Sequence, residues 1–191
     1  MRSPLVLFDR ALDGMERMAV TRANQTAALV VDLGMCVVLA GLGATSGDAH
    51  PLASLSVFLS GLLLFSPIEY AFHRWLFHGA GHAMQRGHLR HHQDPDGIGT
   101  LPFFVPPLFL LALVALLSMM LALDHALLVS GGIASGYFVY GQCHAWIHRS
   151  RFRHPWMRRW AASHHVHHHH PDRNFGVTSP LWDLVLGTRY K

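Results

Sequence analysis

The stretch GIGTLPFFVPPLFLLALVALLSMMLAL, residues 97–123, contains no charged residue and decides the class of the fold. The hydrocarbon core of a bilayer is about 30 Å thick, and a helix of about 20 apolar residues crosses it. Three other stretches of the chain are similarly apolar. We therefore predict an all-α integral membrane protein with four transmembrane helices, at residues 27–45, 52–72, 107–123 and 126–143.

The composition of the 191-residue chain also fits a membrane protein. Hydrophobic residues make up 51% and charged residues only 14%, which is too apolar for a soluble domain of this size. Ahead of the first predicted span, apolar residues recur at helical spacing, as in a helix that lies on a membrane surface. These are Leu5, Phe8, Leu12 and Met15. We expect an amphipathic N-terminal segment at 1–26 and one membrane domain at 27–191.

The basic residues predict the orientation of the spans. All fifteen Lys and Arg residues fall on one side of the four-span arrangement, and cytoplasmic flanks accumulate such residues. We therefore expect both termini and the connection between the second and third spans in the cytosol, with the chain in a bacterial inner membrane. The net charge of +4 comes with no nucleic-acid-binding motif, so we expect no nucleic acid partner.

The histidines follow a repeated pattern at the cytosolic end of each predicted hairpin. A pair of histidines extends the last helix of the hairpin, and an HxxHH cluster follows the pair. The first set, within EYAFHRWLFH and GHLRHH, is His73, His78, His88, His91 and His92. The second set, within GQCHAWIH and HHVHH, is His144, His148, His164, His167 and His168. Neutral imidazole suits iron, zinc, copper and nickel, so ten rings at one membrane face predict a site for about two transition-metal ions.

Helical spacing suggests how the rings are shared between the ions. In HxxHH, positions i, i+3 and i+4 lie on one face of a helix, while the two adjacent histidines point toward different ions. His73 and His78 are five residues apart and would point about 140° apart on an α-helix. That angle predicts either two separate ions or a helix that ends between the two residues.

Other polar residues near the predicted spans have more than one interpretation. Glu69 precedes His73 by one helical turn, so its carboxylate either orients a ligand ring or lies at the surface, for example in a salt bridge with Arg74. Asp32, inside the first predicted span, should face the bundle or reach toward the interface. The isolated histidines should place polar tips at the lipid headgroups rather than bind metal. These are His50, His82, His125 and His154.

In this order, the motifs resemble the integral-membrane fatty acid hydroxylase and sterol desaturase superfamily. The resemblance covers roughly residues 65–188 and includes HRWLFH, HLRHH, HAWIH, HHVHH and NFGVTSPLWDLVLGT; ExxxHRxxFH, HHxxP, VPP and GVTSPLWD are most similar to the fatty acid 2-hydroxylase branch. It implies a four-span protein whose cytosolic helical cap holds a dimetal centre on the ten histidines above. It also implies an O2-dependent hydroxylase of a fatty acyl or related lipid, with two iron ions that zinc can replace in purified protein.

The resemblance selects a register in SHHVHHHH, residues 163–170, where HxxHH fits at 164, 167 and 168 or one residue later. In similar proteins, the distance from the first ligand to the Phe-Gly-Val element matches the distance from His164 to Phe175. His165 is then a candidate to contact a ligand or the substrate. His169 and His170 should be solvated or packed against the cap.

The closing segment also has a local interpretation. Ser179 should cap a short helix that starts at Pro180, and Gly187 should follow the end of that helix. This helix should pack the cap against the site. We expect Asp183, within the helix, to have a structural role.

The resemblance implies an external electron source. Eukaryotic 2-hydroxylases often carry a fused cytochrome b5 domain, and no segment of this sequence encodes one. We therefore expect a separate electron-transfer protein, cytochrome b5-like or ferredoxin-like, together with a lipid substrate from the bilayer. A carotenoid ring or sterol-type hydroxylase or desaturase is the alternative enzyme on the same site. A non-catalytic zinc-binding membrane protein would keep the histidines without redox chemistry, and a metal transporter would place its ligands at the bilayer midplane instead.

Overall fold

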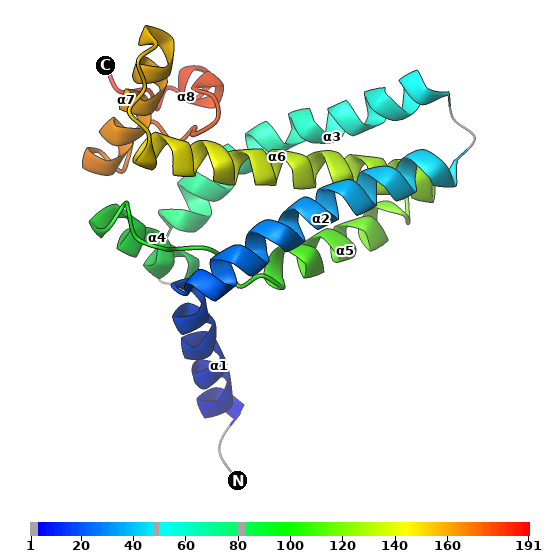
Figure 1. Cartoon of the computed structure of the whole chain (residues 1–191), viewed down its shortest axis with the longest axis horizontal. Helices are drawn as coiled ribbons and strands as arrows, with labels where there is room; N and C mark the ends of the chain where they lie inside the picture. The colour runs from blue at the N-terminus through cyan, green and yellow to red at the C-terminus, as the bar shows by residue number, and fades with distance from the viewer. Residues whose placement is uncertain (1–3, 48–49, 80–82) are drawn as a thin grey trace.

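The computed structural model describes residues 4–47, 50–79 and 83–191, and this part of the chain is all-helical (Figure 1). The helices follow in the order α1 (Pro4–Ala19), α2 (Arg22–Ser46), α3 (Pro51–Ala71), η1 (Phe72–Phe77), α4 (Ala83–Gln93), α5 (Val105–Leu117), α6 (Leu123–Arg149), α7 (Pro155–His169) and α8 (Leu181–Val185). Helix η1 is a π-helix that continues α3 without a break. The all-α class predicted from the sequence is confirmed for the described residues.

Within the described residues, two helices are long and apolar enough to cross a membrane: α2, and the continuous helix formed by α3 and η1. Thr21 caps α2 by accepting a hydrogen bond from the Asn24 amide, and His50 caps α3 in a similar way. Large apolar side chains on both helices face outward, with Val30 65% and Leu63 73% exposed. An exterior of this kind is suited to contact with lipid.

Helix α6 runs through the middle of the bundle and contacts α2, α3 and α5 (Figure 1). Its buried stretch is rich in small residues, which let neighbouring backbones approach closely. Gly131 faces the backbone of Ala40 in α2, and a side chain at Gly132 would overlap the carbonyl oxygen of Phe58 in α3. Close contacts of glycine with backbone therefore hold α2 and α3 against α6.

The third predicted span is shorter than its apolar sequence suggested. Helix α5 ends at Leu117, and the chain turns before α6 begins at Leu123. Thirteen residues of α-helix reach about 20 Å, which is less than the thickness of a hydrocarbon core. Apolarity alone did not locate the end of the helix, because the turn contains Met119 and Met120, which are as apolar as the helix and over 80% exposed.

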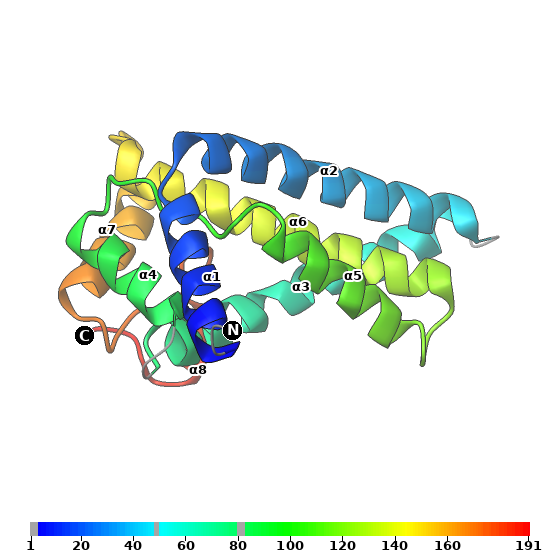
Figure 2. The same cartoon turned by 90° about the horizontal axis from the view of Figure 1, so that it is seen from below.

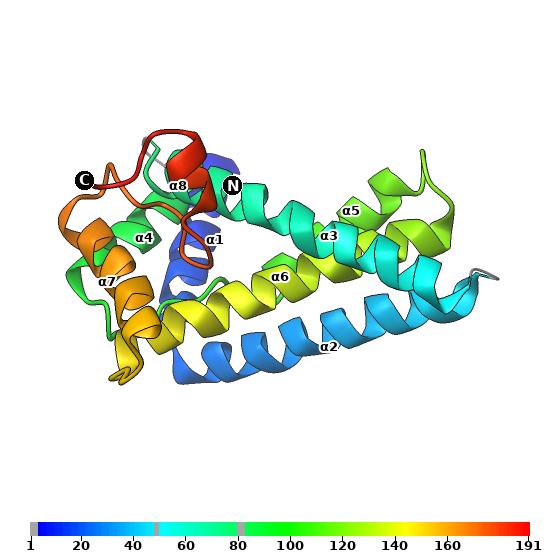
Figure 3. The same cartoon turned by 90° about the horizontal axis from the view of Figure 1, so that it is seen from above.

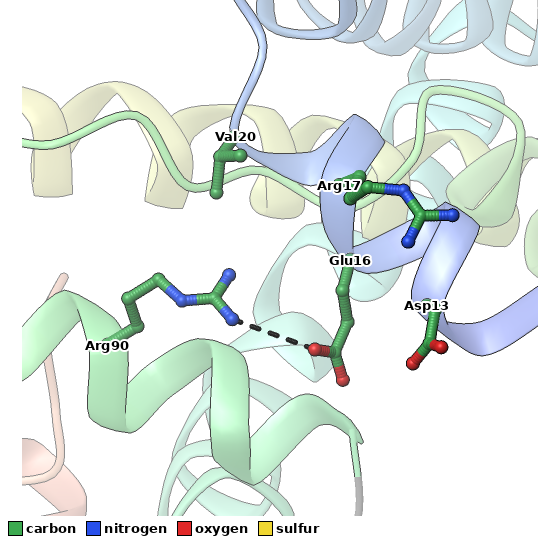
Figure 4. A pocket seen from close by; sticks show the side chains of 5 residues that line it. All are labelled: Asp13, Glu16, Arg17, Val20 and Arg90. Atoms are coloured by element: carbon green, nitrogen blue, oxygen red, sulfur yellow. Dashed lines mark ion pairs between the residues drawn. The ribbon is translucent and has the colours of Figure 1, made fainter. Parts of the chain in front are cut away.

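The cap lies at one end of the bundle and is built by α4, α7 and α8 (Figures 1 and 3). Helix α1 lies at the same end and runs across the bundle axis, beside α4 (Figure 2). Glu16 of α1 accepts hydrogen bonds from the Arg86 guanidinium of α4 at 2.9 and 2.6 Å. It also lies 3.6 Å from the Arg90 guanidinium of the same helix (Figure 4). An ion-pair network therefore joins α1 to the cap.

The isolated histidines have local roles. His50 and His154 cap α3 and α7, since each ring accepts a hydrogen bond from the amide two residues later, and the His125 ring contacts Asp124 at 3.0 Å. His82 lies outside the described residues. Asp32 is partly buried on α2, with one carboxylate oxygen shielded from solvent, so it faces the bundle.

Candidate metal centre

The structure brings the ten patterned histidines together into two groups of five rings at the base of the cap. Within each group, one nitrogen from every ring lies within 4.8 Å of the others. The first cluster consists of His73, His78, His88, His92 and His167. The second cluster consists of His91, His144, His148, His164 and His168. No other group of metal-binding side chains of this kind occurs among the described residues.

Each of the two histidine sets defined from the sequence contributes four rings to one cluster and one ring to the other. The exchange occurs at the adjacent pairs of the HxxHH motifs. His91 joins the second cluster while His92 joins the first, and His168 and His167 divide in the same way. Neighbouring residues on a helix point about 100° apart, so each pair reaches both clusters. The sequence prediction that adjacent histidines diverge agrees with this arrangement.

The pair His73 and His78 differs from the sequence expectation, because both rings lie in the first cluster. The expected angle of 140° assumed α-helical geometry, but residues 72–77 form a π-helix. A π-helix closes hydrogen bonds between residues five apart, and here the His78 amide donates to the His73 carbonyl at 3.3 Å. The wider turn brings positions i and i+5 onto one face, so the pair does not divide between two sites. The other alternative agrees with the structure, because the helix ends at Phe77, between His73 and His78.

Ring nitrogens without protons converge in the first cluster. The Nδ1–H groups of His73 and His167 donate to the carbonyls of Phe175 and Arg173 at 2.5 and 2.7 Å. A neutral imidazole carries one N–H, so the Nε2 atoms of these two rings hold lone pairs. They face the Nε2 atoms of His88 and His78, each at 3.1 Å. Lone pairs that face one another repel, and a cation bound between these Nε2 atoms would remove the repulsion.

The nitrogen spacing fits ligation of a transition metal. A metal–nitrogen bond of about 2.1 Å places neighbouring ligand nitrogens about 3 Å apart. In the second cluster, His164 Nε2 lies 3.0 Å from the Nε2 atoms of both His144 and His148, and 3.1 Å from that of His168. His91 Nε2 is buried with no hydrogen-bond partner among the described residues, as expected of an atom whose partner is a metal.

The electrostatic environment keeps these rings in the form that binds metal. Burial, together with neighbouring imidazoles, lowers the pKa of His91 to about 3 and that of His168 to about 2. Burial is also the main cause that lowers the pKa of His164 well below its usual range. Neutral imidazole is the ligand form at neutral pH, so the donor set fits iron or zinc.

A buried carboxylate supports the first cluster from behind. Asp183 is fully buried and accepts hydrogen bonds from the amides of Phe175 and Gly176, both at 2.8 Å, and from the Thr188 hydroxyl at 2.7 Å. Because the Phe175 carbonyl holds His73, the position of that ring depends on Asp183 through the backbone. The predicted structural role of Asp183 is in agreement with these contacts.

Glu69 supports the same segment rather than a histidine. Its carboxylate accepts hydrogen bonds from the amides of Val177 and Thr178 at 2.7 and 2.9 Å, and from the Thr178 hydroxyl. It is 5% exposed and makes neither the contact with a ligand ring nor the surface salt bridge with Arg74 that the sequence suggested. Glu69 is one turn before His73, but its carboxylate is bonded to residues 177 and 178 instead of a ring.

The histidines of SHHVHHHH, residues 163–170, fall into two groups, inside and outside the clusters. His164, His167 and His168 lie in the clusters, whereas His165 and His169 are exposed outside them. The His165 ring lies 5.6 Å from the His148 ring between centroids, and His170 stacks on Tyr190 at 4.4 Å.

The closing helix begins one residue later than the sequence predicted. Helix α8 starts at Leu181 with Pro180 in the cap position, although Ser179 Oγ still accepts a hydrogen bond from the Leu181 amide at 3.2 Å. Proline fits either position because it has no N–H to donate. Gly187 follows the helix with a positive φ of 68°, which glycine adopts without strain.

The sequence analysis missed several residues that hold the cap together. Asn174 has a positive φ of 51°, and its side chain bonds the Ser163 carbonyl at 3.0 Å and the Tyr190 amide at 2.8 Å. Trp160 donates to the Val177 carbonyl at 2.7 Å. The available signal was the density of Asn, Gly, Thr, Ser and Pro in residues 174–180, which is typical of an ordered loop.

The chain is similar to several known proteins over most of its length. The family model described as fatty acid hydroxylase matches residues 58–188. The dihydroceramide fatty acyl 2-hydroxylase FAH2 of Arabidopsis thaliana is 32% identical over 81% of this chain and 68% of its own length. The ceramide very long chain fatty acid hydroxylase SCS7 of Saccharomyces cerevisiae is 31% identical, over 80% of this chain and 42% of its own length.

A human protein and a solved structure give consistent results. The fatty acid 2-hydroxylase of Homo sapiens is 33% identical over 69% of this chain, which spans 39% of that protein. The solved structure of full-length Scs7p, in which only the hydroxylase domain is visible, superposes with a TM-score of 0.77 and 27% identity. That superposition covers 93% of this chain and 70% of the solved chain.

Proposed function

Because this chain belongs to the fatty acid hydroxylase family, we propose that it is an O2-dependent lipid hydroxylase with a di-iron centre. The observation that carries the proposal is the gathering of ten histidines into two five-ring clusters at the end of an apolar bundle. We propose that all ten are ligands, so that each cluster holds one ion. Zinc would occupy the same ligands in purified protein, since it ranks above iron in affinity.

The bound iron pair would supply O2 activation for attack on an unreactive C–H bond. The residues of the chain provide the remaining features of the site. Asp183 and Glu69 fix the loop whose carbonyls orient His73 and His167. Tyr140 stacks on His144 at 5.8 Å and packs against Phe65 at 6.3 Å. These aromatic rings place apolar surface between the second cluster and the bundle, where an acyl chain can approach and water is excluded.

The proposed topology puts α2, α3 with η1, α5 and α6 in the membrane and the cap in the cytosol. Helix α5 would cross only part of the hydrocarbon, with α1 on the membrane surface beside the cap. The one-sided basic residues support this orientation, and the course of α1 across the bundle axis supports a surface position (Figure 2).

In intact cells, Arg86→Cys and Arg158→Cys should resist an impermeant thiol reagent added outside. Labelling at either position would contradict the orientation.

We propose the 2-position of a fatty acyl chain as the site of hydroxylation. The support comes from the relatives, which include a dihydroceramide fatty acyl 2-hydroxylase of Arabidopsis thaliana and the fatty acid 2-hydroxylase of Homo sapiens. The outward apolar faces of α2 and α3 let a lipid stay in the bilayer while the first carbons of its acyl chain enter the cap. The headgroup would then remain at the cytosolic interface.

The test is reconstitution of metal-free protein with iron under anaerobic conditions, followed by addition of O2, a reductant and an N-acyl sphingoid lipid. Mass spectrometry should detect a product that gains one oxygen atom, with fragments that place it next to the acyl carbonyl. Protein loaded with zinc is the matched control and should give no product. Absence of product from fully iron-loaded protein with several acyl lipids would refute the hydroxylase function and favour a zinc-binding role. A hydroxyl group at another carbon would refute only the assignment of the position.

A further inference from the structure

The connection from α6 to α7 and the first turn of α7 carry five arginines and no acidic residue within residues 149–159. We name them the arginine surface: Arg149, Arg151, Arg153, Arg158 and Arg159. All five are exposed, and none makes an ion pair with any residue that the structure describes. The arginines of α4 differ, because both form ion pairs with Glu16: Arg86 at 2.6 Å, and Arg90 at 3.6 Å as Figure 4 shows. The arginine surface is therefore an uncompensated positive charge on the cap.

This surface adjoins the second cluster. Arg149 directly follows His148, one of the five rings of that cluster. On α7, Arg158 shares an exposed face with Ala162, His165 and His169, which follow at intervals of three or four residues. The exposed His165 ring lies 5.6 Å from the His148 ring. His165 and His148 therefore connect the arginine surface with the interior of the candidate metal centre.

We propose that the arginine surface is the docking site of an acidic electron-carrier protein, which passes electrons to the second cluster beside His165 and His148. The inference rests on the proposed function and names the partner of that same site. Insertion of one oxygen atom of O2 into a C–H bond reduces the other atom to water. That reaction consumes two electrons and two protons in addition to the lipid and O2, and the carrier supplies the electrons.

The chemistry of the surface favours a protein partner. Trp156 is 67% exposed and stacks on Trp160, with centroids 6.4 Å apart and planes 13° apart. Tryptophan and arginine are the side chains most enriched at the energetic centres of protein interfaces. Clustered positive charge also speeds the encounter with an acidic protein. Helix α7 lies beyond the ends of α2 and α3, on the side of the cap away from the bundle (Figures 1 and 3), which is the aqueous side in the proposed topology.

The first arm of the test measures binding without turnover. Full-length, metal-free protein in nanodiscs of zwitterionic lipid is titrated with the soluble haem domain of a cytochrome b5 as the acidic probe. The variant Arg151→Glu/Arg153→Glu/Arg158→Glu should raise Kd by roughly tenfold or more, and added salt should weaken wild-type binding. The matched control, Arg10→Glu/Arg189→Glu/Lys191→Glu, makes the same charge change at exposed positions elsewhere and should keep the wild-type Kd.

The second arm measures turnover of iron-loaded protein with two sources of electrons. The arginine variant should lose turnover driven by the haem domain and keep turnover driven by dithionite, with unchanged metal content. Equal haem-domain affinity in the wild type and the variant, or equal losses in variant and control, would overturn the docking site. A variant that keeps the carrier affinity but loses a dependence on anionic lipid would assign the surface to the membrane and also overturn the proposal. If dithionite yields no product from the wild type, the hydroxylase function fails, and the binding arm alone decides the docking site.

Discussion

Replacing Asp183 by asparagine should release metal from the first cluster before the second. The carboxylate accepts three hydrogen bonds, from the amides of Phe175 and Gly176 and from the Thr188 hydroxyl. Asparagine keeps the shape but turns one acceptor into a donor, which then faces a buried N–H or O–H group. A hydrogen bond to a charged group contributes about 1.5–3 kcal/mol, so the substitution should cost about 3 kcal/mol of stability in the closing segment.

The loss reaches the metal through the backbone. The Phe175 carbonyl holds the Nδ1–H of His73, and the Arg173 carbonyl two residues earlier holds that of His167. Both rings belong to the first cluster. Loss of an outer partner of a ligand histidine typically weakens metal affinity by about 10–100-fold. The Nδ1 atoms of His164 and His168, in the second cluster, have no hydrogen-bond partner among the described residues, so that cluster should be affected much less.

The assay is metal content per chain under competition with a chelator, together with thermal unfolding in detergent. Asp183→Asn should retain about one ion where the wild type retains two, on the ligand assignment proposed above. Adding His92→Ala should cause no further loss, because both changes act on the first cluster, whereas adding His91→Ala should remove the remaining ion. Asp172→Asn is the control, since this carboxylate is exposed and only meets Arg173 at 3.3 Å. Wild-type affinity for both ions in Asp183→Asn would refute the reasoning, as would release from the second cluster first.

The sequence predicted which histidines gather because their information is local. Within one helix, HxxHH fixes the relative directions of its rings whatever the helix packs against. The hairpin topology then placed both motifs at one end of the bundle. The register within SHHVHHHH was not local information of this kind: two registers fit the helix, and the family resemblance selected His164, His167 and His168. These three rings lie in the clusters, whereas His165 is exposed.

Features that depend on packing were not predicted. The division of the rings into clusters requires α4 and α7 to face each other across the helices that carry the paired histidines. The π-helix at residues 72–77 has no signature in the sequence used here, and it alone brings His73 and His78 together. Glu69 makes neither of the contacts expected from the sequence, because its partners come from residues 177–178, more than a hundred positions later. Spacing within a helix carries no information about such contacts.

The double variant His91→Ala/His92→Ala should lose both metal ions although the two residues are adjacent, whereas each single variant should lose one; equal metal loss in the double and single variants would contradict the division of the clusters. Metal-free protein should lose stability as pH falls below about 6.5, because the histidines of the unfolded chain bind protons that the buried imidazoles, with lowered pKa, do not accept. Denaturant titrations at several pH values measure how the free energy of unfolding changes with pH. A free energy of unfolding that does not change with pH would exclude neutral rings. Gly132→Ala should destabilise the bundle by about 1–3 kcal/mol, since its Cβ would overlap the Phe58 carbonyl where α3 crosses α6. Gly141→Ala on the same helix meets no atom within 4 Å and controls for the effect of alanine on the helix itself. Because the crossing also sets the distance between the two hairpins that share the clusters, Gly132→Ala should weaken metal retention in parallel with thermal stability. An unchanged melting temperature would show that α3 and α6 do not pack through this glycine.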